Sequence, residues 1–595
     1  MRFLAALLLL VTACGPAAPV APTPGPSSPA TPTPQNVPTV TSTQPPAATA
    51  TPRAQSQPQS PAAPETRVEP ATSRSVAENV LSRMTLEQKV GQVFMLGFEG
   101  TTLTSGNRAL IHDLHLGGVT LFARNIENAT QLARLNADLQ TIADPVPLFV
   151  SVDQEGGLVV RVTDGATIFP GNMAVAATGD LDLARRLAQA SATELLAMGI
   201  NMSLAPVVDV NTNPLNPVIG VRSFGSDPEF VGRFGSATID GLQSSGVSAV
   251  AKHFPGHGDT AVDSHHDLPV VPHPLERLDA IEFQTFRAAI TSGVDGVMTA
   301  HVYLPTIEPE QDRPSTLSRA ILTGLLRERL GFTGLILTDA LDMGAIKRDR
   351  SAAAAAVDAF EAGADLLLVA GITREDRAHL GEGPPGLLAA VQSGRISEAR
   401  LDASVLRVLE AKAKRGILPG AAPRPSTPST DVLGSRRHRD LALDVARKAI
   451  TLQRDDAHAL PLSPAQKALV VVPEAPTRSD VQDDRLASSL VEAVRGFART
   501  ASGATPAEAV QHARSADVVV LATYDLAQDP TQQRLARALA ETGKPVVAVS
   551  LRGPYDAAVA PFLPTVLAAY GDRPVHLQAA AEALFGQLTP TGHAP

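Results

Sequence analysis

Residues 334–341 read Gly-Leu-Ile-Leu-Thr-Asp-Ala-Leu, in which a short apolar run over residues 334–338 is followed by the acidic residue Asp339. A run of this length, bounded by glycine and apolar almost throughout, is typical of a strand in a parallel sheet that is covered on both faces. A carboxylate at the end of such a strand has little structural purpose unless it pairs with a cation. The stretch therefore predicts a buried parallel strand with a functional residue at its carboxyl end.

Similar runs recur between residues 75 and 415 and alternate with amphipathic segments rich in Ala, Leu and Arg. The strand-like runs are Val90–Phe98, Gly118–Ala123, Leu148–Asp153, Asn201–Val210, Val247–Phe254, Gly296–Val302, Gly334–Leu341 and Asp365–Gly371; helix-like segments include Leu181–Met198, Pro274–Thr291 and Arg319–Leu330. Eight such repeats predict a (β/α)₈ TIM-type barrel over residues 75–417. A doubly wound open sheet is the alternative, but it accounts less well for the polar residues that follow many of the strands.

A smaller domain follows a second proline-rich stretch, which we take as a linker over residues 418–432. Residues 433–595 contain the helix-like segments Arg439–Thr451 and Gln532–Thr542 and the strand-like runs Ala468–Val472, Asp517–Thr523, Pro545–Leu551 and Thr565–Tyr570. They predict a C-terminal α/β sandwich domain. Because neither G-x-G-x-x-G nor G-x-x-x-x-G-K-[ST] occurs in it, we expect no nucleotide site there.

Composition narrows the functional classes. The chain has 595 residues, a single Cys, 49 Pro and a formal net charge of −10. One cysteine excludes a disulfide framework or a multi-cysteine metal site. The acidic balance argues against nucleic acid as a partner, because phosphate binding requires a basic face.

The first 74 residues predict secretion and a tether. Residues 1–14 combine one positive charge, an apolar run and Thr-Ala-Cys, which is too short for a stable membrane span and fits a signal peptide. Val11-Thr12-Ala13-Cys14 resembles the bacterial lipobox, so we expect Cys14 to be lipidated and the protein to be anchored to the cell envelope. An ordinary cleavage site with an incidental Cys is the alternative. Residues 15–74 are rich in Pro, Thr and Ala and predict an extended, disordered tether.

The densest polar cluster is Lys252–Asp267, which reads KHFPGHGDTAVDSHHD. A metal site is one interpretation, but Pro255 and Gly256 break any helix that would align His253 with His257, and no third ligand has a suitable spacing. We therefore expect no metal. A merely structural turn is another interpretation, and it fits Gly256, Gly258 and His257.

The remaining interpretation of this cluster is catalytic. Asp263 stands two residues before His265, which we place on an extended segment; there the carboxylate can fix the tautomer of the imidazole and leave the other ring nitrogen for proton transfer. Carboxylates and cations also follow other strands, and together they suit a polyhydroxylated ligand. These residues are Asp153, Arg161, Arg222, His301 and Asp339. A carboxylate nucleophile with a separate acid/base is the arrangement of retaining glycoside cleavage.

Four motifs now identify a family. They are DQEGG (Asp153–Gly157), NPVIGVRSFG (Asn216–Gly225), KHFPGHGDTAVDSHHDLP (Lys252–Pro269) and LTDALDMGAI (Leu337–Ile346). With them the chain resembles glycoside hydrolase family 3, in particular its β-N-acetylglucosaminidase branch, which trims peptidoglycan fragments. The motifs span the barrel, and the second domain resembles the C-terminal α/β domain of the family.

The resemblance implies the site and the reaction. Asp339 would be the nucleophile, His265 the general acid/base and Asp263 its orienting partner. Sugar-binding residues would be Asp153, Arg161, Arg222, Lys252 and His253. Leu158 stands where the family often has Arg, directly after DQEGG. No cofactor is implied, and the expected partners are a GlcNAc-containing oligosaccharide or muropeptide and, through the anchor, a membrane.

Three alternatives remain open at this point. A β-glucosidase of the same family is one, although such enzymes usually take their acid/base from the second domain. A phosphorylase is another, because a neutral His acid/base does not repel phosphate as a carboxylate would. The third is a non-catalytic sugar-binding lipoprotein, against which the joint presence of Asp339, Asp263 and His265 argues.

Overall fold

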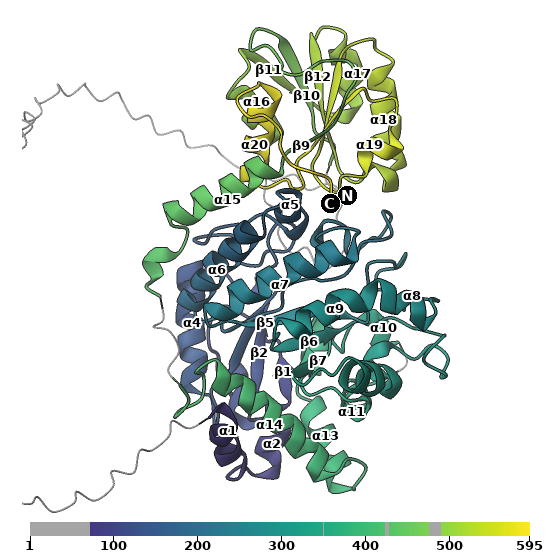
Figure 1. Cartoon of the computed structure of the whole chain (residues 1–595). Helices are drawn as coiled ribbons and strands as arrows, with labels where there is room; N and C mark the ends of the chain where they lie inside the picture. The colour runs from purple at the N-terminus through teal and green to yellow at the C-terminus, as the bar shows by residue number, and fades with distance from the viewer. Residues whose placement is uncertain (1–71, 349, 423–427, 475–488) are drawn as a thin grey trace, which may run out of the picture. The chain divides into compact units, whose positions relative to one another are not determined.

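The computed structural model describes residues 72–348, 350–422, 428–474 and 489–595 (Figure 1). The predicted signal peptide with Cys14, most of the predicted tether and part of the predicted linker lie outside these ranges. Helix α1 (Ser73–Leu81) begins two residues before the predicted start of the barrel, and its N-cap Thr72 accepts a hydrogen bond from the Ser75 amide.

Within the described ranges, eight parallel strands form the predicted barrel. Around the sheet the order is β7-β6-β5-β4-β3-β2-β1-β8, so strands that follow one another along the chain are neighbours. The bounds are β1 (Phe94–Leu96), β2 (Gly118–Leu121), β3 (Phe149–Val152), β4 (Met202–Ser203), β5 (Ser248–Phe254), β6 (Gly296–Thr299), β7 (Leu335–Leu337) and β8 (Leu367–Val369). This fold class is the one that the sequence predicted.

Helices cover the outside of the strands (Figure 1). They are α2 (Leu86–Gln92), α3 (Ser105–Asp113), α4 (Ala129–Thr141), α5 (Asn172–Ala177), α6 (Leu181–Ala197), α7 (Pro228–Ser244), α8 (Leu275–Ala280), α9 (Glu282–Thr291), the π-helical segment η4 (Ala320–Arg329), α10 (Gly344–Lys347), α11 (Ala352–Ala362), α12 (Arg374–Ala378), α13 (Gly383–Gln392) and α14 (Glu398–Lys414). Short 3₁₀ turns are η1 (Ala123–Asn125), η2 (Gly220–Arg222), η3 (Ser315–Leu317), η5 (Thr430–Val432) and η6 (Leu526–Gln528).

The barrel closes at a seam between β7 and β8 that has little ladder pairing. One isolated bridge joins Leu337 to Leu366. The buried Asp365 reinforces this seam: its amide donates to the Ile336 carbonyl over 2.8 Å, and its carboxylate accepts the Ile336 amide over 3.0 Å. Ser404 of α14 (2.6 Å) and Arg327 of η4 bind the same carboxylate. An acidic side chain therefore links two strands and two helices where the sheet is weakest.

Each barrel strand is shorter than the run that predicted it, and the difference is largest in two of the runs. The first three residues of Val90–Phe98 are helical, because Thr85 and Gln88 form a capping box that starts α2 before the strand begins. In Asn201–Val210, only Met202 and Ser203 pair as a regular strand. Pro206 removes a backbone donor from the rest of that run.

The C-terminal domain is built on a six-stranded sheet in the order β11-β10-β12-β13-β14-β9, in which β9 alone is antiparallel to its neighbour. Its elements are α15 (Arg436–Ala449), β9 (Thr451–Asp455), β10 (Lys467–Val471), α16 (Leu490–Arg495), β11 (Thr500–Ala504), α17 (Pro506–Ala513), β12 (Val518–Thr523), α18 (Pro530–Ala540), β13 (Val546–Ser550), α19 (Asp556–Val559), β14 (Thr565–Ala568) and α20 (Pro574–Leu584). The edge strands β9 and β11 were not predicted, because TLQRD and TASGA lack an apolar pattern.

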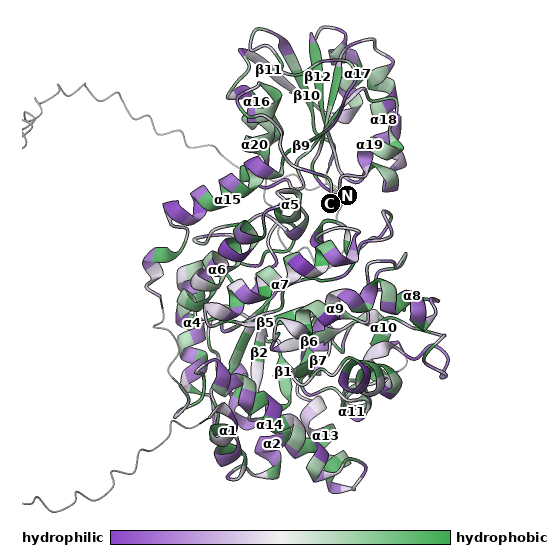
Figure 2. Ribbon diagram, viewed as in Figure 1, coloured by the Kyte–Doolittle hydropathy of each residue, from purple (hydrophilic) through white to green (hydrophobic). Residues whose placement is uncertain are grey.

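Apolar side chains gather inside the barrel, between its strands and helices, and on both faces of the second sheet. Figure 2 shows this as mostly green strands beside helices that carry both green and purple. Two further clusters join the domains. In one, Phe169 and Val175 of the barrel pack with Ala442 and Val445 of α15, and in the other Met173 packs with residues that include Tyr570. No helix in the described ranges combines the length and apolarity needed to cross a bilayer.

The seam yields a first prediction. Asp365→Asn should lower the free energy of unfolding by about 3–5 kcal/mol, because it removes a fully buried carboxylate and leaves the partly buried guanidinium of Arg327 without that counter-charge. Urea unfolding followed by circular dichroism measures the change. The matched control is Asp182→Asn, which removes an exposed carboxylate paired with Arg185 and should leave the midpoint unchanged. Equal midpoints in the two variants would contradict the role given to Asp365.

Candidate active site

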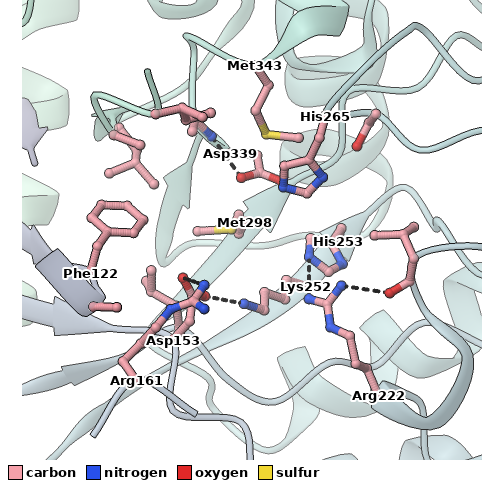
Figure 3. A pocket seen from close by; sticks show the side chains of 18 of the residues that line it. Phe122, Asp153, Arg161, Arg222, Lys252, His253, His265, Met298, Asp339 and Met343 are labelled. Carbon is pink, nitrogen blue, oxygen red and sulfur yellow. Dashed lines mark hydrogen bonds and ion pairs between the residues drawn. The ribbon is translucent and has the colours of Figure 1, made fainter. Parts of the chain in front are cut away.

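A cavity of about 680 Å³ opens at the carboxyl ends of the barrel strands. This is the face at which TIM barrels carry their functional residues, and the volume suits a small ligand. The cavity brings together, from segments far apart in the sequence, Asp153, Arg161, Arg222, Lys252, His253, His265 and Asp339 (Figure 3). Asp263 does not line it but reaches it through His265.

One wall of the cavity is an ionic cluster around Lys252. Its ammonium group lies 2.6 Å from Asp153 Oδ1 and 2.7 Å from Glu155 Oε1. The second carboxylate oxygen of Asp153 lies 3.6 Å from Arg161. Burial lowers the pKa of Lys252, but the two carboxylates outweigh it and hold the pKa above the usual value, so the amine stays charged. Charged donors and acceptors fixed in this way can bind vicinal hydroxyl groups.

Glu155 is central to this wall, although the sequence analysis gave it no role beyond its place in DQEGG. It accepts two hydrogen bonds from Arg222, at 2.9 Å from Nε and 2.8 Å from Nη2. Its side chain is 2% exposed, and burial would raise its pKa, yet Arg222 and Lys252 hold that pKa well below the usual range. Arg222 also donates to the Val218 carbonyl. Three donor atoms of the Arg222 guanidinium are thus hydrogen-bonded to protein groups. Arg222 therefore holds the wall together as well as lining the cavity.

A second buried carboxylate, Asp209, was missed by the sequence analysis. Its Oδ2 lies 2.7 Å from Nδ1 of His253, and its Oδ1 accepts the His257 amide over 2.7 Å. His253 therefore presents Nε2 toward Arg222, 3.4 Å away. The sequence did contain a signal for this residue: Asp209 ends the run Val207-Val208-Asp209 after the fourth strand, much as Asp339 follows the seventh.

The segment with Asp263 and His265 is a turn rather than the extended chain that we expected. Asp263 Oδ1 accepts both the backbone amide of His265, over 2.9 Å, and its ring Nδ1, over 2.7 Å. The amides of His266 and Asp267 bond to the Asp263 carbonyl. The extended prediction was wrong because an Asp side chain that bonds to the amide two residues on favours a turn. The turn still brings the carboxylate and the imidazole together, with Nε2 left for a ligand.

His257 supports this turn through two side-chain hydrogen bonds. Its Nδ1 lies 2.8 Å from the Thr260 hydroxyl and its Nε2 lies 3.0 Å from the Ser264 hydroxyl. Because Thr260 donates to the His257 carbonyl, it can accept from Nδ1–H, which leaves Nε2 to accept from Ser264. Burial lowers the pKa of His257 to about 4, so the ring is neutral at pH 7. His257 also lines the cavity, so a purely structural role does not account for all of its surroundings.

Asp339 follows β7 on the opposite wall. Its Oδ1 accepts the Ala340 amide over 2.8 Å, and His301 holds the same turn by donating from Nε2 to the Ala340 carbonyl, also over 2.8 Å. Burial raises the pKa of Asp339, but the surrounding imidazoles, that of His301 foremost, outweigh it and hold the pKa below the usual value. The group is therefore an anion that faces the cavity across from the Lys252 wall (Figure 3).

The rim near β1, β2 and β8 carries residues that the sequence did not suggest. Glu99 and Arg377 form an ion pair of 2.6 Å, and the guanidinium of Arg124 lies 4.4 Å from the ring centre of Phe122. All four line the cavity. Glu99 and Phe122 lie in loops, Arg124 in η1 and Arg377 in α12. No distinctive spacing relates these residues, so no signal short of the fold would have grouped them.

Across the described residues, no group of three or more His, Cys, Asp or Glu side chains is arranged to hold a metal ion. His253 and His257 lie near each other, with ring centres 6.0 Å apart and their planes tilted by 72°. Each is bonded through Nδ1 to a protein oxygen instead.

Comparisons with known proteins agree with this architecture. The family profile described as "Glycosyl hydrolase family 3 N terminal domain" matches residues 85–411, and that described as "Glycosyl hydrolase family 3 C-terminal domain" matches residues 450–595. The chain belongs to glycosyl hydrolase family 3. It is accordingly a glycoside hydrolase, and the family match extends over both domains.

Three relatives illustrate its place in family 3. Beta-hexosaminidase A of Pseudoalteromonas piscicida is 35% identical over 66% of this chain and 71% of its own length. A beta-N-acetylglucosaminidase/beta-glucosidase of Cellulomonas fimi is 31% identical over 87% of this chain and 94% of its own. The solved structure of a family 3 beta-N-acetylglucosaminidase from Paenibacillus sp. str. FPU-7 is 42% identical, with a TM-score of 0.80, over 86% of this chain and 98% of its own.

The burial of His257 yields a prediction about pH. Its pKa is lower in the folded protein than the 6.5 of an ordinary histidine, so its contribution to stability is complete above pH 6.5 and is lost as the pH falls toward 4. The loss amounts to about 1.4 kcal/mol per pH unit in that window. In His257→Asn the slope of unfolding free energy against pH should be flatter by about one proton. Denaturant titrations at several pH values measure it, and identical slopes in both proteins would contradict a neutral, buried His257.

Proposed function

We propose that the protein is a retaining exo-β-N-acetylglucosaminidase that removes the non-reducing terminal GlcNAc from peptidoglycan fragments or chito-oligosaccharides. The observation that carries the proposal is the placement of the Asp339 anion and the Asp263–His265 pair at one cavity, beside the buried ionic wall of Asp153 and Lys252. The hexosaminidase names of the relatives support the choice of sugar.

In the first step of the proposed reaction, Asp339 attacks the anomeric carbon and the bond to the leaving oxygen breaks. His265 donates a proton from Nε2 to that oxygen, while Nδ1–H remains bonded to the Asp263 carboxylate. Burial raises the pKa of Asp263, but its hydrogen bond to His265 outweighs this and keeps the pKa low, so Asp263 stays a carboxylate that stabilises the imidazolium.

In the second step, His265 accepts a proton from water through Nε2 as the water attacks the glycosyl–Asp339 ester. Two inversions at the anomeric carbon retain the β configuration. The ionic wall binds the hydroxyl groups of the sugar, in which Asp153 accepts and Lys252 donates. No metal or cofactor enters either step.

The decisive experiment removes the two reacting groups separately. Asp339→Ala should lower kcat on a chromogenic β-N-acetylglucosaminide by at least about three orders of magnitude, with sugar binding largely intact, because no nucleophile remains. Added azide should restore turnover and yield the α-glycosyl azide, since one displacement on a β-glycoside inverts it. His265→Ala with azide should instead yield the β-azide, because azide then intercepts the glycosyl–Asp339 ester. A residual rate within tenfold of wild type would rule out Asp339 as the nucleophile.

The same assay separates the alternatives. The Cellulomonas fimi relative carries both activities in its name, so the chromogenic β-glucoside is measured in parallel with the N-acetylglucosaminide. Faster turnover of the glucoside would favour a β-glucosidase, and sugar 1-phosphate as the main product in phosphate buffer would favour a phosphorylase. Sugar binding without turnover of either substrate would favour the binding-protein interpretation.

We also propose that the enzyme acts outside the cytoplasm as a lipoprotein anchored through Cys14. Support comes from the lipobox-like Val11-Thr12-Ala13-Cys14 and from the proline-rich residues that follow. Because Cys14 is the one cysteine of the chain, a Cys14→Ser variant has no other thiol to acylate. Expressed in a bacterial host fed with an alkyne-labelled fatty acid, the wild type should be labelled and partition with membranes, and Cys14→Ser should do neither. Equal labelling of the two proteins would contradict the anchor.

A further inference from the structure

The C-terminal domain reaches the sugar-binding wall through one buried arginine. Arg573 stands directly before α20, the helix coloured yellow in Figure 1. Its side chain is 2% exposed, its Nε donates to the Gly157 carbonyl over 2.8 Å, and its Nη2 donates to the Leu158 carbonyl over 3.3 Å. Gly157 and Leu158 belong to the barrel, and they stand two and three residues after Glu155 of the wall.

These two carbonyls form the tip of a tight turn. The Glu155 amide bonds to the Val159 carbonyl over 3.0 Å, so the chain reverses between these residues. Gly156 and Gly157 have φ values of +89° and +57°, and the Gly157 amide bonds to the Phe169 carbonyl over 2.8 Å. The amides of Glu155 and Gly157 thus bond within the barrel. The carbonyls of Gly157 and Leu158 accept hydrogen bonds from Arg573.

The turn and the ionic wall are linked through Glu155. Glu155 lies at the base of the turn and aligns both Arg222 and Lys252, and Asp153 lies two residues earlier. A shift of the turn tip therefore moves carboxylates whose partners are held at fixed distances. Hydrogen bonds between charged and polar groups weaken steeply when their geometry changes.

Arg573 is itself held firmly. Leu577 and Ala580 of α20 pack in the core of the C-terminal domain, and Val575 packs both there and against the barrel cluster around Phe169. A second contact of the same domain supports the neighbouring segment: the Tyr555 hydroxyl accepts from Asn211, whose side-chain oxygen accepts the Gly220 amide. Gly220 opens the η2 turn that ends with Arg222.

We propose that Arg573 is a positioning residue through which the C-terminal domain sets the affinity of the barrel site for the sugar. It touches no substrate and acts by holding the Gly157–Leu158 tip, and with it Asp153 and Glu155. The proposal rests on the proposed function in that the ionic wall is taken to bind the sugar. In this proposal the C-terminal domain contributes to substrate binding through Arg573, although Arg573 does not line the cavity.

The test compares Arg573→Ala and Arg573→Lys with a control in the same domain. In Arg573→Ala, KM for the chromogenic N-acetylglucosaminide and the inhibition constant of free GlcNAc should both rise about tenfold, while kcat changes less than twofold, because binding is lost in ground and transition states alike. Both constants are independent of the fraction of folded enzyme. Arg573→Lys should recover part of the affinity, since an ammonium group can reach one of the two carbonyls.

The control is Arg447→Ala, which removes the ion pair of 2.6 Å between α15 and Glu582 of α20 and leaves the barrel turn untouched. It should keep KM within twofold of wild type. If Arg573→Ala also keeps KM and the inhibition constant within twofold, Arg573 only stabilises the fold and the proposal is overturned.

A second measurement does not depend on the substrate. Hydrogen exchange of the peptide that spans residues 154–160 should be about tenfold faster in Arg573→Ala than in Arg447→Ala, because the amides of Glu155 and Gly157 lose protection when the tip is released. Equal exchange in the two variants overturns the proposal even if the protein turns over no GlcNAc substrate. A wild type inactive on GlcNAc, with faster exchange in Arg573→Ala, would count against the proposed function and in favour of the positioning role.

Discussion

The buried carboxylate of Glu155 is the constraint on which the site depends. It lies between the guanidinium of Arg222 and the ammonium of Lys252, and all three side chains are almost without contact to solvent. Removing one partner from such a group leaves an uncompensated buried charge, which costs about 3–5 kcal/mol. The loops after β3 and β4 are therefore tied to each other and to strand β5, which carries Lys252, before any ligand arrives.

This arrangement explains how loops can form a precise site. Asp209 is a second buried carboxylate with a similar part, because it binds the ring of His253 and the backbone amide of His257. His257 in turn supports Ser264 between the two members of the Asp263–His265 pair. A series of buried acceptors and donors thus connects the ionic wall to the segment that carries His265. Preorganisation of this kind favours catalysis because the polar groups need not reorient during the reaction.

The second domain belongs to the same network. Arg573 holds the turn after Glu155, and Tyr555 holds the segment before Arg222. Arg573 binds a backbone carbonyl and Tyr555 binds the side-chain amide of Asn211, so neither contact is made inside the cavity. The barrel carries the groups that we propose to react, and the C-terminal domain restrains two of the loops that line the cavity.

The sequence by itself determined the fold class and pointed to the residues that we propose as catalytic, because apolar runs of strand length and a dense polar motif are local properties of the chain. It determined less well where β4 ends and that β9 and β11 exist, since short or polar strands gain their stability from neighbours. It also placed the Asp263 segment as extended, although the Asp side chain bonds to its own turn. Only the tertiary structure decided the roles of Glu155, Asp209 and Arg573. Each acts through partners tens to hundreds of residues away, and the burial that makes a charge pair strong arises only when those segments pack together.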